Sequence, residues 1–90
     1  MIYDFDIFSV DLIIDSDSTL YWKDRKTGQE ESENTKTIHT DKYKTLVSWL
    51  ETNKTFVTMF SDFQKGKAYA FLYWDDGRIM PVTGSIKMKE

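Results

Sequence analysis

Apolar and polar residues alternate along most of this chain, and this period of two restricts the possible folds more than any other feature. A β-strand points successive side chains to opposite faces, so the alternation predicts strands that bury one face. In residues 2–14 the apolar side chains occupy odd positions as far as Ile7 and even positions from Phe8 onward. We therefore predict one long strand over residues 2–14, with a β-bulge or bend between Ile7 and Phe8.

Further alternating segments are separated by short runs of turn-forming residues. The predicted strands are Thr19–Arg25, Thr55–Phe63, Lys67–Trp74 and Arg78–Lys89, and the predicted turns are Asp15–Ser18, Gln64–Gly66 and Asp75–Gly77. Residues of these turn types bond to their own backbone or supply a positive φ angle. Because Pro81 has no amide hydrogen, we expect the last strand either to lie at a sheet edge or to carry an irregularity there. The first two strands then form a hairpin, and the last three form a meander.

Residues 41–52 are the segment where a helical period competes with the alternation. Its apolar residues fall at positions i, i+3, i+4 and i+7, namely Tyr43, Leu46, Val47 and Leu50. This spacing is typical of an amphipathic helix, and we predict one there. The polar stretch 27–34 is predicted to be a mobile loop, and residues 36–39 a short strand. The expected fold class is α+β: an antiparallel sheet, made of the N-terminal hairpin and the C-terminal three-stranded meander, with one main α-helix packed on it.

Composition indicates a single globular domain over residues 1–90. Three Trp, five Tyr and six Phe provide a large apolar area for a chain of this length. There is no Cys, which excludes disulfides and thiolate zinc sites and is consistent with a reducing cytoplasm. The N-terminus lacks the basic region of a secretory signal, and the longest apolar run, Ala68–Trp74, is too short for a membrane-spanning helix. We expect a complete small gene product in the cytoplasm, with a homodimer as one way to gain stability.

Negative charge is concentrated in the first third of the chain. Residues 1–34 contain nine acidic and three basic side chains, whereas residues 35–90 contain six acidic and nine basic ones. The nine acidic residues are Asp4, Asp6, Asp11, Asp15, Asp17, Asp24, Glu30, Glu31 and Glu33. Carboxylates two residues apart on a strand are separated by about 6.7 Å, which is close to two phosphate steps of about 3.4 Å along one DNA strand. A row of them could therefore occupy the basic, nucleic-acid-binding site of a protein partner.

In size, acidic composition, lack of Cys and the nine acidic positions just named, the chain resembles small phage-encoded DNA mimics such as the anti-restriction proteins of the T-even phages. The resemblance implies a non-enzymatic inhibitor that presents an acidic face to a nuclease or a DNA-binding protein, often as a dimer. The basic C-terminal half differs from members of that class that are acidic throughout. Each carboxylate alone also suits a turn, an edge strand or a solvated loop. A toxin-neutralising immunity protein would use the same electrostatics, so this alternative stays open.

A second candidate surface is the aromatic segment 67–74. Its sequence, KAYAFLYW, resembles the first ribonucleoprotein motif of RNA-recognition domains, in which a basic residue precedes alternating aromatics. We expect Tyr69, Phe71 and Tyr73 to share one strand face, which makes single-stranded nucleic-acid binding the alternative function. An aromatic-rich core strand is the simpler interpretation, because the next segment is predicted to be a strand where that family has a helix.

The sequence contains no recognisable catalytic, metal-binding or cofactor-binding motif. His39 is the only His, and no Ser or Thr has an identifiable His partner. The run Asp15-Ser16-Asp17 starts like a calcium loop, but Gly is missing at the sixth position and Glu at the twelfth. The favoured interpretation is therefore no enzyme activity, no cofactor, no direct nucleic-acid binding and no membrane binding, with a protein as the partner of the acidic face.

Overall fold

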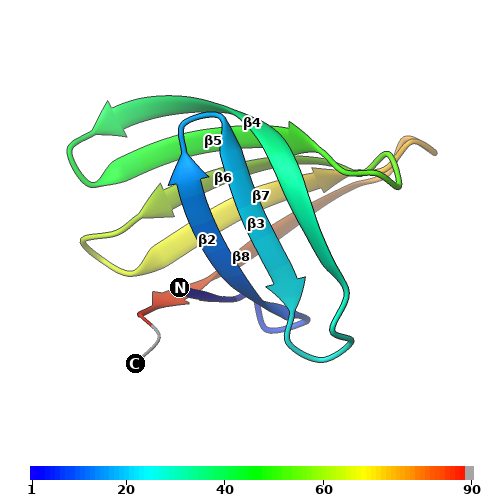
Figure 1. Cartoon of the computed structure of the whole chain (residues 1–90), viewed down its shortest axis with the longest axis horizontal. Helices are drawn as coiled ribbons and strands as arrows, with labels where there is room; N and C mark the ends of the chain where they lie inside the picture. Colours follow the sequence, from blue (N-terminus) through cyan, green and yellow to red (C-terminus); the bar gives the residue numbers. More distant parts are fainter. Residues whose placement is uncertain (89–90) are drawn as a thin grey trace.

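The computed structural model describes residues 1–88, which form eight antiparallel strands closed into one barrel (Figure 1). The strands are β1 (Ile2–Asp4), β2 (Ser9–Ser16), β3 (Thr19–Asp24), β4 (Glu30–Asp41), β5 (Lys44–Leu50), β6 (Phe56–Asp62), β7 (Lys67–Tyr73) and β8 (Ile79–Lys87). Each strand pairs with the next one in the chain, and β1 pairs with β8 to close the barrel. The prediction of an α+β fold is wrong, because the described residues are all-β. Within residues 1–88 no helix is long and apolar enough to cross a membrane.

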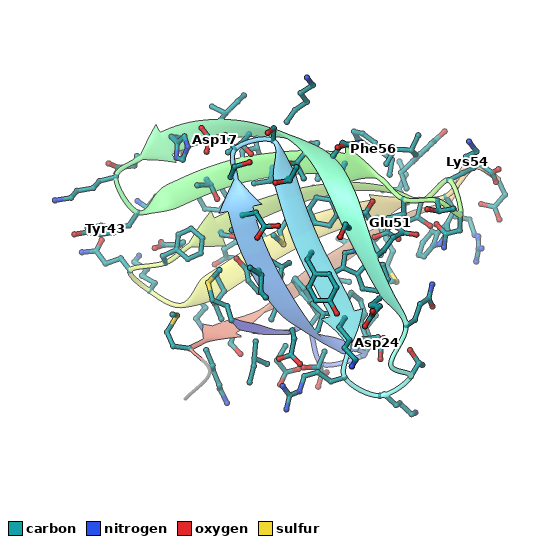
Figure 2. All side chains as sticks on the ribbon, viewed as in Figure 1. Asp17, Asp24, Tyr43, Glu51, Lys54 and Phe56 are labelled. Atoms are coloured by element: carbon teal, nitrogen blue, oxygen red, sulfur yellow. The ribbon has the colours of Figure 1, made fainter. Side chains whose placement is uncertain are left out.

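The connections between strands alternate between the two ends of the barrel, because consecutive strands run antiparallel. The mouth end is formed by the turns 5–8, 25–29, 51–55 and 74–78. The floor end is formed by the turns 17–18, 42–43 and 63–66, together with the start of β1 and the end of β8. Figure 2 shows Asp24 and Glu51 toward the mouth end and Tyr43 toward the floor end.

The segment predicted to be a helix consists of strand β5 and the turn before it. Thr45, Val47 and Trp49 are buried on its inward face. Leu50 on the outer face is 55% exposed. The helical spacing arose because apolar residues occupy both faces of this strand. β-branched and aromatic residues favour an extended chain, and β5 pairs with β4 on one side and β6 on the other.

The phase change after Ile7 is a chain reversal and not a bulge within one long strand. β1 ends at Asp4, and β2 runs antiparallel to it after the turn 5–8. The Phe5 amide donates a hydrogen bond to the Phe8 carbonyl oxygen at 2.9 Å. Asp6 has a φ of 75°, which closes this tight turn. A switch of phase can mark either a bulge or a reversal, so alternation alone did not distinguish them.

The acidic segment predicted to be a mobile loop is mostly strand. β4 covers Glu30–Asp41, so it includes the predicted short strand 36–39 and several residues before it. Its inward side chains toward the mouth end are polar, and Glu33 is 5% and Thr35 is 4% exposed. A strand with a polar buried face lacks the hydrophobic alternation by which strands are recognised in a sequence.

Strand β8 accommodates Pro81 because its neighbour β1 is short. β1 pairs only with Ser85–Lys87, so Pro81 has a strand partner on one side only, in β7. The strand is thus an edge at this point, although the barrel is closed. Further along, the backbone of β1 crosses Gly84 so closely that a Cβ there would overlap the Asp4 carbonyl group. Lys89, at the end of the predicted strand, lies outside the described residues.

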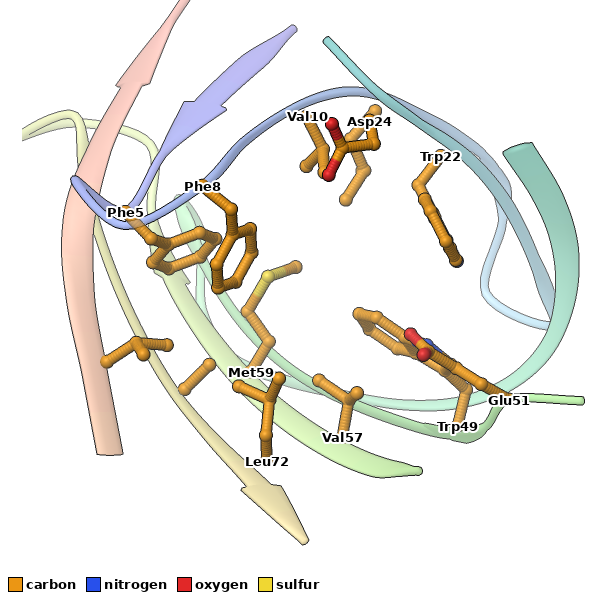
Figure 3. Close-up of a pocket in the computed structure, with 13 residues that line it drawn as sticks. Phe5, Phe8, Val10, Trp22, Asp24, Trp49, Glu51, Val57, Met59 and Leu72 are labelled. Carbon is orange, nitrogen blue, oxygen red and sulfur yellow. The ribbon is translucent and has the colours of Figure 1, made fainter. Parts of the chain in front are cut away.

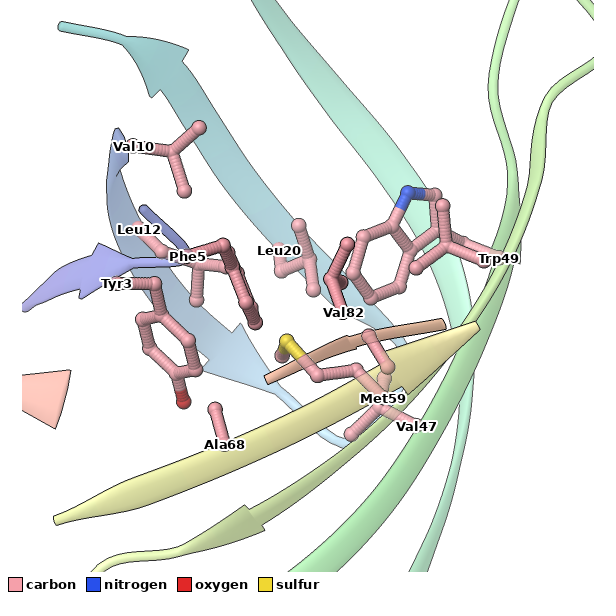
Figure 4. Close-up of a cluster of buried hydrophobic side chains, with 12 residues drawn as sticks. Tyr3, Phe5, Val10, Leu12, Leu20, Val47, Trp49, Met59, Ala68 and Val82 are labelled. Carbon is pink, nitrogen blue, oxygen red and sulfur yellow. The ribbon is translucent and has the colours of Figure 1, made fainter. Parts of the chain in front are cut away.

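The buried hydrophobic side chains form one cluster inside the barrel (Figure 4), and the most completely buried ones include residues of the floor half. Tyr3 and Ser61 are fully buried, and Leu20 is 1% exposed. The Tyr3 hydroxyl and Ser61 Oγ are hydrogen-bonded at 2.9 Å, so each satisfies the other away from water. Burial raises the pKa of Tyr3 to about 12, although the bond to Ser61 opposes the rise. The phenol therefore stays neutral, and this half of the interior is a packed core.

Candidate functional site

The mouth half of the interior contains a cavity of about 190 Å³ (Figure 3). Its lining residues are Phe5, Phe8, Val10, Leu12, Trp22, Asp24, Trp49, Glu51, Val57, Met59, Ala70, Leu72 and Val82. Phe8, Asp24 and Glu51 at the rim are partly exposed, so a ligand can enter from the mouth end. An engineered cavity of about 150 Å³ in another protein binds benzene, so this volume suits one ring with a short chain.

The cavity exists because small side chains form one wall. Ala70 of β7 points inward between Met59 of β6 and Val82 of β8, its partners in the two ladders. Val57 points inward one pair nearer the mouth, opposite Leu72. Side chains of this size do not reach the opposite wall of the barrel. Tyr3 and Leu20 fill the interior of the floor half, whereas the corresponding space in the mouth half stays empty.

Four aromatic side chains give the cavity flat walls. The rings of Phe5 and Phe8, from the turn 5–8, have centroids 5.2 Å apart and are tilted by 37°. Trp22 of β3 and Trp49 of β5 complete the set, and Figure 3 shows both indoles beside the open space. Flat apolar groups pack well against such rings, and cations are attracted to their faces.

Both indoles are held by hydrogen bonds to glutamates. Trp22 Nε1 donates to Glu33 Oε2 at 2.7 Å. Trp49 Nε1 donates to Glu51 Oε2 at 3.1 Å. The polar edge of each ring is therefore satisfied by a carboxyl group, which leaves the apolar faces available to the cavity.

Glu33 and Glu31 share a hydrogen bond beside Trp22. Burial raises the pKa of Glu33 to about 8, and its hydrogen bond with Glu31 acts in the same direction. The pKa of Glu31 is lowered, first by that bond with Glu33 and then by bonds from Thr52, whose amide lies 3.3 Å from Glu31 Oε2. At neutral pH Glu33 therefore keeps its proton while Glu31 is ionised.

Asp24 and Glu51 are the two carboxylates that line the cavity itself. The amides of Thr27 and Lys26 donate to Asp24 Oδ1 at 2.9 and 2.8 Å, and these bonds lower its pKa. Burial raises the pKa of Glu51, whereas its bond from Trp49 lowers it. The turn after β3 thus holds an ionised carboxylate at the rim, and the turn after β5 holds a second carboxyl group, Glu51, whose burial disfavours the charged form.

The charged groups at the cavity are all acidic. None of its thirteen lining residues is Lys, Arg or His. Two nearby basic side chains pair with acids on the outer surface: Lys23 Nζ is 3.9 Å from Glu30 Oε2, and Arg25 NH1 is 2.8 Å from Asp11 Oδ1. A third, Lys26, acts electrostatically on Asp24. The site is therefore an apolar enclosure with a negatively charged rim.

The nine acidic residues of the first third do not gather on one face. Five are exposed on the outside of the barrel: Asp4, Asp6, Asp15, Asp17 and Glu30. One, Asp11, is partly buried on the outside. Three lie at the interior of the mouth end: Asp24, Glu31 and Glu33. Asp17 Oδ1, for example, lies 2.8 Å from His39 Nε2 at the floor end. The structure thus provides no continuous acidic surface, and it does not support a DNA-mimicking or anti-restriction role.

Sequence reasoning missed most of the cavity. Trp22 falls within the predicted strand Thr19–Arg25, and Trp49 and Glu51 fall within the predicted helix 41–52. Glu31 and Glu33 occupy inward positions of β4, where apolar residues are expected, but only the structure shows that these positions face inward. Buried acids of this kind are typical of functional sites.

The aromatic side chains of β7 share one strand face, as predicted, but they are not buried. Tyr69, Phe71 and Tyr73 share the outer face of β7 and are 48%, 57% and 44% exposed. The inward positions are Ala68, Ala70 and Leu72. The simpler interpretation of these aromatics as core residues is therefore wrong, whereas their use as a nucleic-acid surface stays a prediction.

The carboxyl groups at the mouth end do not form a metal site. Within residues 1–88 no group of three or more His, Asp or Glu side chains is arranged so that it could hold a metal ion. The acids are instead engaged by indole and backbone N–H groups, as described above.

Comparison with known proteins identifies the family and supports the fold. The model of the MoaF-like family matches residues 1–87, so the chain belongs to this family. A crystal structure from Burkholderia vietnamiensis, provisionally described as a beta-lactamase, is similar with a TM-score of 0.78 over 92% of this chain and 82% of that chain, at 16% sequence identity. At this identity the likeness shows the fold alone. No curated protein matches the chain.

Proposed function

We propose that this member of the MoaF-like family is a binding protein that holds one small, largely apolar molecule in the mouth half of its barrel. The single observation that carries the proposal is the cavity of about 190 Å³. An eight-stranded barrel is just wide enough either to be filled by side chains or to hold one small ligand. In this chain the floor half is filled and the mouth half is hollow, so one barrel combines both arrangements.

Binding is favoured over catalysis by the chemistry of the lining. The thirteen residues include no Ser, Thr, Cys, His or Lys that could attack an acyl group. This cavity therefore offers no nucleophile for the beta-lactamase activity named in the description of the Burkholderia vietnamiensis protein. The cytoplasmic location expected from the Cys-free composition is part of the same proposal.

Single-stranded nucleic-acid binding is the second candidate function. It rests on the exposure of Tyr69, Phe71 and Tyr73 on the outer face of β7, because bases stack on such rings. This surface is separate from the cavity, and a gel-shift assay with single-stranded RNA tests it directly. Loss of a shift in the variant Phe71→Ala would support it, and the absence of any shift in the unmodified protein would exclude it.

The cavity is tested by titrating the protein with a neutral probe of matching size. We expect 2-phenylethanol to bind with a Kd of about 1 mM or tighter, measured by calorimetry at pH 7. The variant Leu72→Trp should abolish binding, because Leu72 lines the cavity and a larger side chain occupies the same space. The matched control is Phe71→Trp, which changes the adjacent outward position of β7.

The control variant should bind the probe as the unmodified protein does, and both variants should keep their thermal midpoints within a few degrees. Equal binding by all three proteins would place the probe outside the barrel and contradict the proposal. Failure of the unmodified protein to bind any apolar probe of this size would contradict it as well.

A further inference from the structure

We infer that the ligand of this cavity carries one cationic nitrogen, held at the rim by Asp24 and Glu51, with an apolar body that extends toward Met59. This inference rests on the proposed binding function and adds the chemical class of the ligand. It follows from the charges at the rim, the aromatic walls and the order of polar and apolar groups along the barrel.

The first argument is the sign of the charge. Both ionisable residues that line the cavity are acidic, and none of its lining residues is Lys, Arg or His, although Lys26 in the adjacent turn acts electrostatically on Asp24. Ionised Glu31 adds negative charge nearby, since it acts electrostatically on Glu51. Carboxylates in a partly desolvated site are stabilised by a cation that binds between them and are destabilised by an anion.

The second argument is that Glu51 can accept a hydrogen bond from a cation in addition to the one from the Trp49 indole. Trp22 and Trp49 each donate one hydrogen bond to a glutamate, at 2.7 and 3.1 Å. A carboxylate oxygen accepts more than one hydrogen bond, so Glu51 can also accept from an ammonium group. The bond from Trp49 fixes the Glu51 side chain at the rim before a ligand arrives, which lowers the entropy lost on binding.

The third argument is the set of rings. A cation that lies over an aromatic face is attracted by the ring quadrupole, most strongly for Trp. Trp22, Trp49, Phe5 and Phe8 all line the same cavity as the two carboxylates. Acidic groups combined with several aromatic faces are the arrangement by which proteins recognise ammonium groups.

The fourth argument is orientation. Asp24 and Glu51 lie at the end of β3 and just after β5, on the mouth side, and Figure 3 shows them at different points of the rim. Met59 is 2% exposed, and the lining at its depth is apolar. A charged head is therefore accommodated at the rim and an apolar body below it. The volume of about 190 Å³ limits that body to roughly one ring and a short chain.

Three probes of nearly equal size test the inference by calorimetry at pH 7: 2-phenylethylammonium, 2-phenylethanol and 3-phenylpropionate. We expect the ammonium probe to bind at least about tenfold more tightly than the alcohol, and the carboxylate probe to bind more weakly than the alcohol. The variants Glu51→Gln and Asp24→Asn should each weaken the ammonium probe by about threefold to tenfold and affect the alcohol much less. Each amide keeps the oxygen that accepts the bond from Trp49 or from the Thr27 amide.

The matched control is Asp15→Asn, which removes one negative charge from an exposed position near the floor end. It should leave the affinities for all three probes unchanged. Equal affinity of the unmodified protein for the ammonium probe and the alcohol would overturn this inference while the proposed binding function stands. An equal loss in Asp15→Asn, Asp24→Asn and Glu51→Gln would also overturn it, since net charge alone would then explain the preference. Binding of none of the three probes would instead remove the proposed function itself.

Discussion

The floor half and the mouth half of the barrel are built by the same strands but are filled in different ways. In the floor half, Tyr3, Leu20 and Ser61 are at most 1% exposed and close the interior with a buried hydrogen bond. In the mouth half, small residues such as Ala70 form one wall, and four aromatic rings and two carboxylates surround an empty space. Each strand pairs with both of its neighbours, although β8 has its β1 partner only at Ser85–Lys87. The comparison shows that the size and polarity of inward side chains decide which part of a barrel is core and which part is a site.

The largest expected effect comes from breaking the closure that both halves share. Gly84 lies where the backbone of β1 crosses β8, so the variant Gly84→Val places a side chain onto the Asp4 carbonyl group. We expect the free energy of unfolding to fall by about 3 kcal/mol or more, measured by urea denaturation. The control is Thr83→Val, at the adjacent exposed position of β8. A loss in Gly84→Val no greater than in the control would show that β1 does not cross β8 this closely.

The second prediction compares the stability lost when a leucine is shortened in the floor half and in the mouth half. The variant Leu20→Ala empties part of the packed floor half, and we expect it to lower the free energy of unfolding by about 3 kcal/mol. The variant Leu72→Ala removes a side chain that already borders the cavity and is only partly buried, so we expect a loss of about 1 kcal/mol. Urea denaturation of the two variants measures the difference. Equal losses would mean that the mouth half is packed as tightly as the floor half.

The smallest expected effect concerns the pH dependence of stability that comes from Glu33 in the mouth half. The pKa of Glu33 is about 8 in the folded protein, against 4.5 as its ordinary value. Between these two pH values the folded protein therefore holds a proton that the unfolded chain has lost. The contribution of Glu33 to the free energy of unfolding falls as the pH rises through this range, and above about pH 8 it stays low. The raised pKa of Glu51 acts in the same direction, whereas the lowered pKa of Glu31 affects stability only below its ordinary value of 4.5.

The variant Glu33→Gln has no proton to lose and keeps an oxygen that accepts the bond from Trp22. We expect it to be more stable than the unmodified protein by about 2 kcal/mol at pH 9 and to differ little at pH 5, measured by urea denaturation at both values. Glu30→Gln, at the adjacent exposed position of β4, is the control and should change stability by less than about 0.5 kcal/mol at either pH. A gain for Glu33→Gln that is the same at both pH values would exclude a buried, protonated Glu33.

The sequence predicted the C-terminal meander and the outline of the hairpin β2–β3, because their inward faces are apolar and their turns carry Asp, Ser and Gly. It did not reveal β4, because the inward Glu33 and Thr35 are polar. It did not reveal β5, because the apolar Leu46 and Leu50 on its outer face contribute to the spacing of an amphipathic helix. Closure of the barrel depends on the pairing of Ile2–Asp4 with Ser85–Lys87. That contact joins the two ends of the described chain and leaves no local pattern in the sequence.

The candidate site could be predicted only in part for a similar reason. The sequence singles out nine acidic residues as one partner-binding face, but Asp24, Glu31 and Glu33 lie at the interior, because the side of the sheet that each faces depends on strand register. A shift of one residue moves a side chain from the outside to the interior. Without the register, three interior carboxyl groups could not be separated from six outer ones, and Trp22 and Trp49 could not be placed beside them.

The central claim, that the mouth half is a ligand site, is tested most directly through the three tryptophan indole N–H signals in a ¹H–¹⁵N correlation spectrum. Trp22 and Trp49 line the cavity, whereas Trp74 lies outside its lining, with its ring 5.0 Å from the Arg78 guanidinium carbon. Titration with 2-phenylethylammonium should shift the Trp22 and Trp49 signals together along one saturable binding curve and leave the Trp74 signal in place. Movement of the Trp74 signal alone, or of none of the three at saturating probe, would contradict the claim.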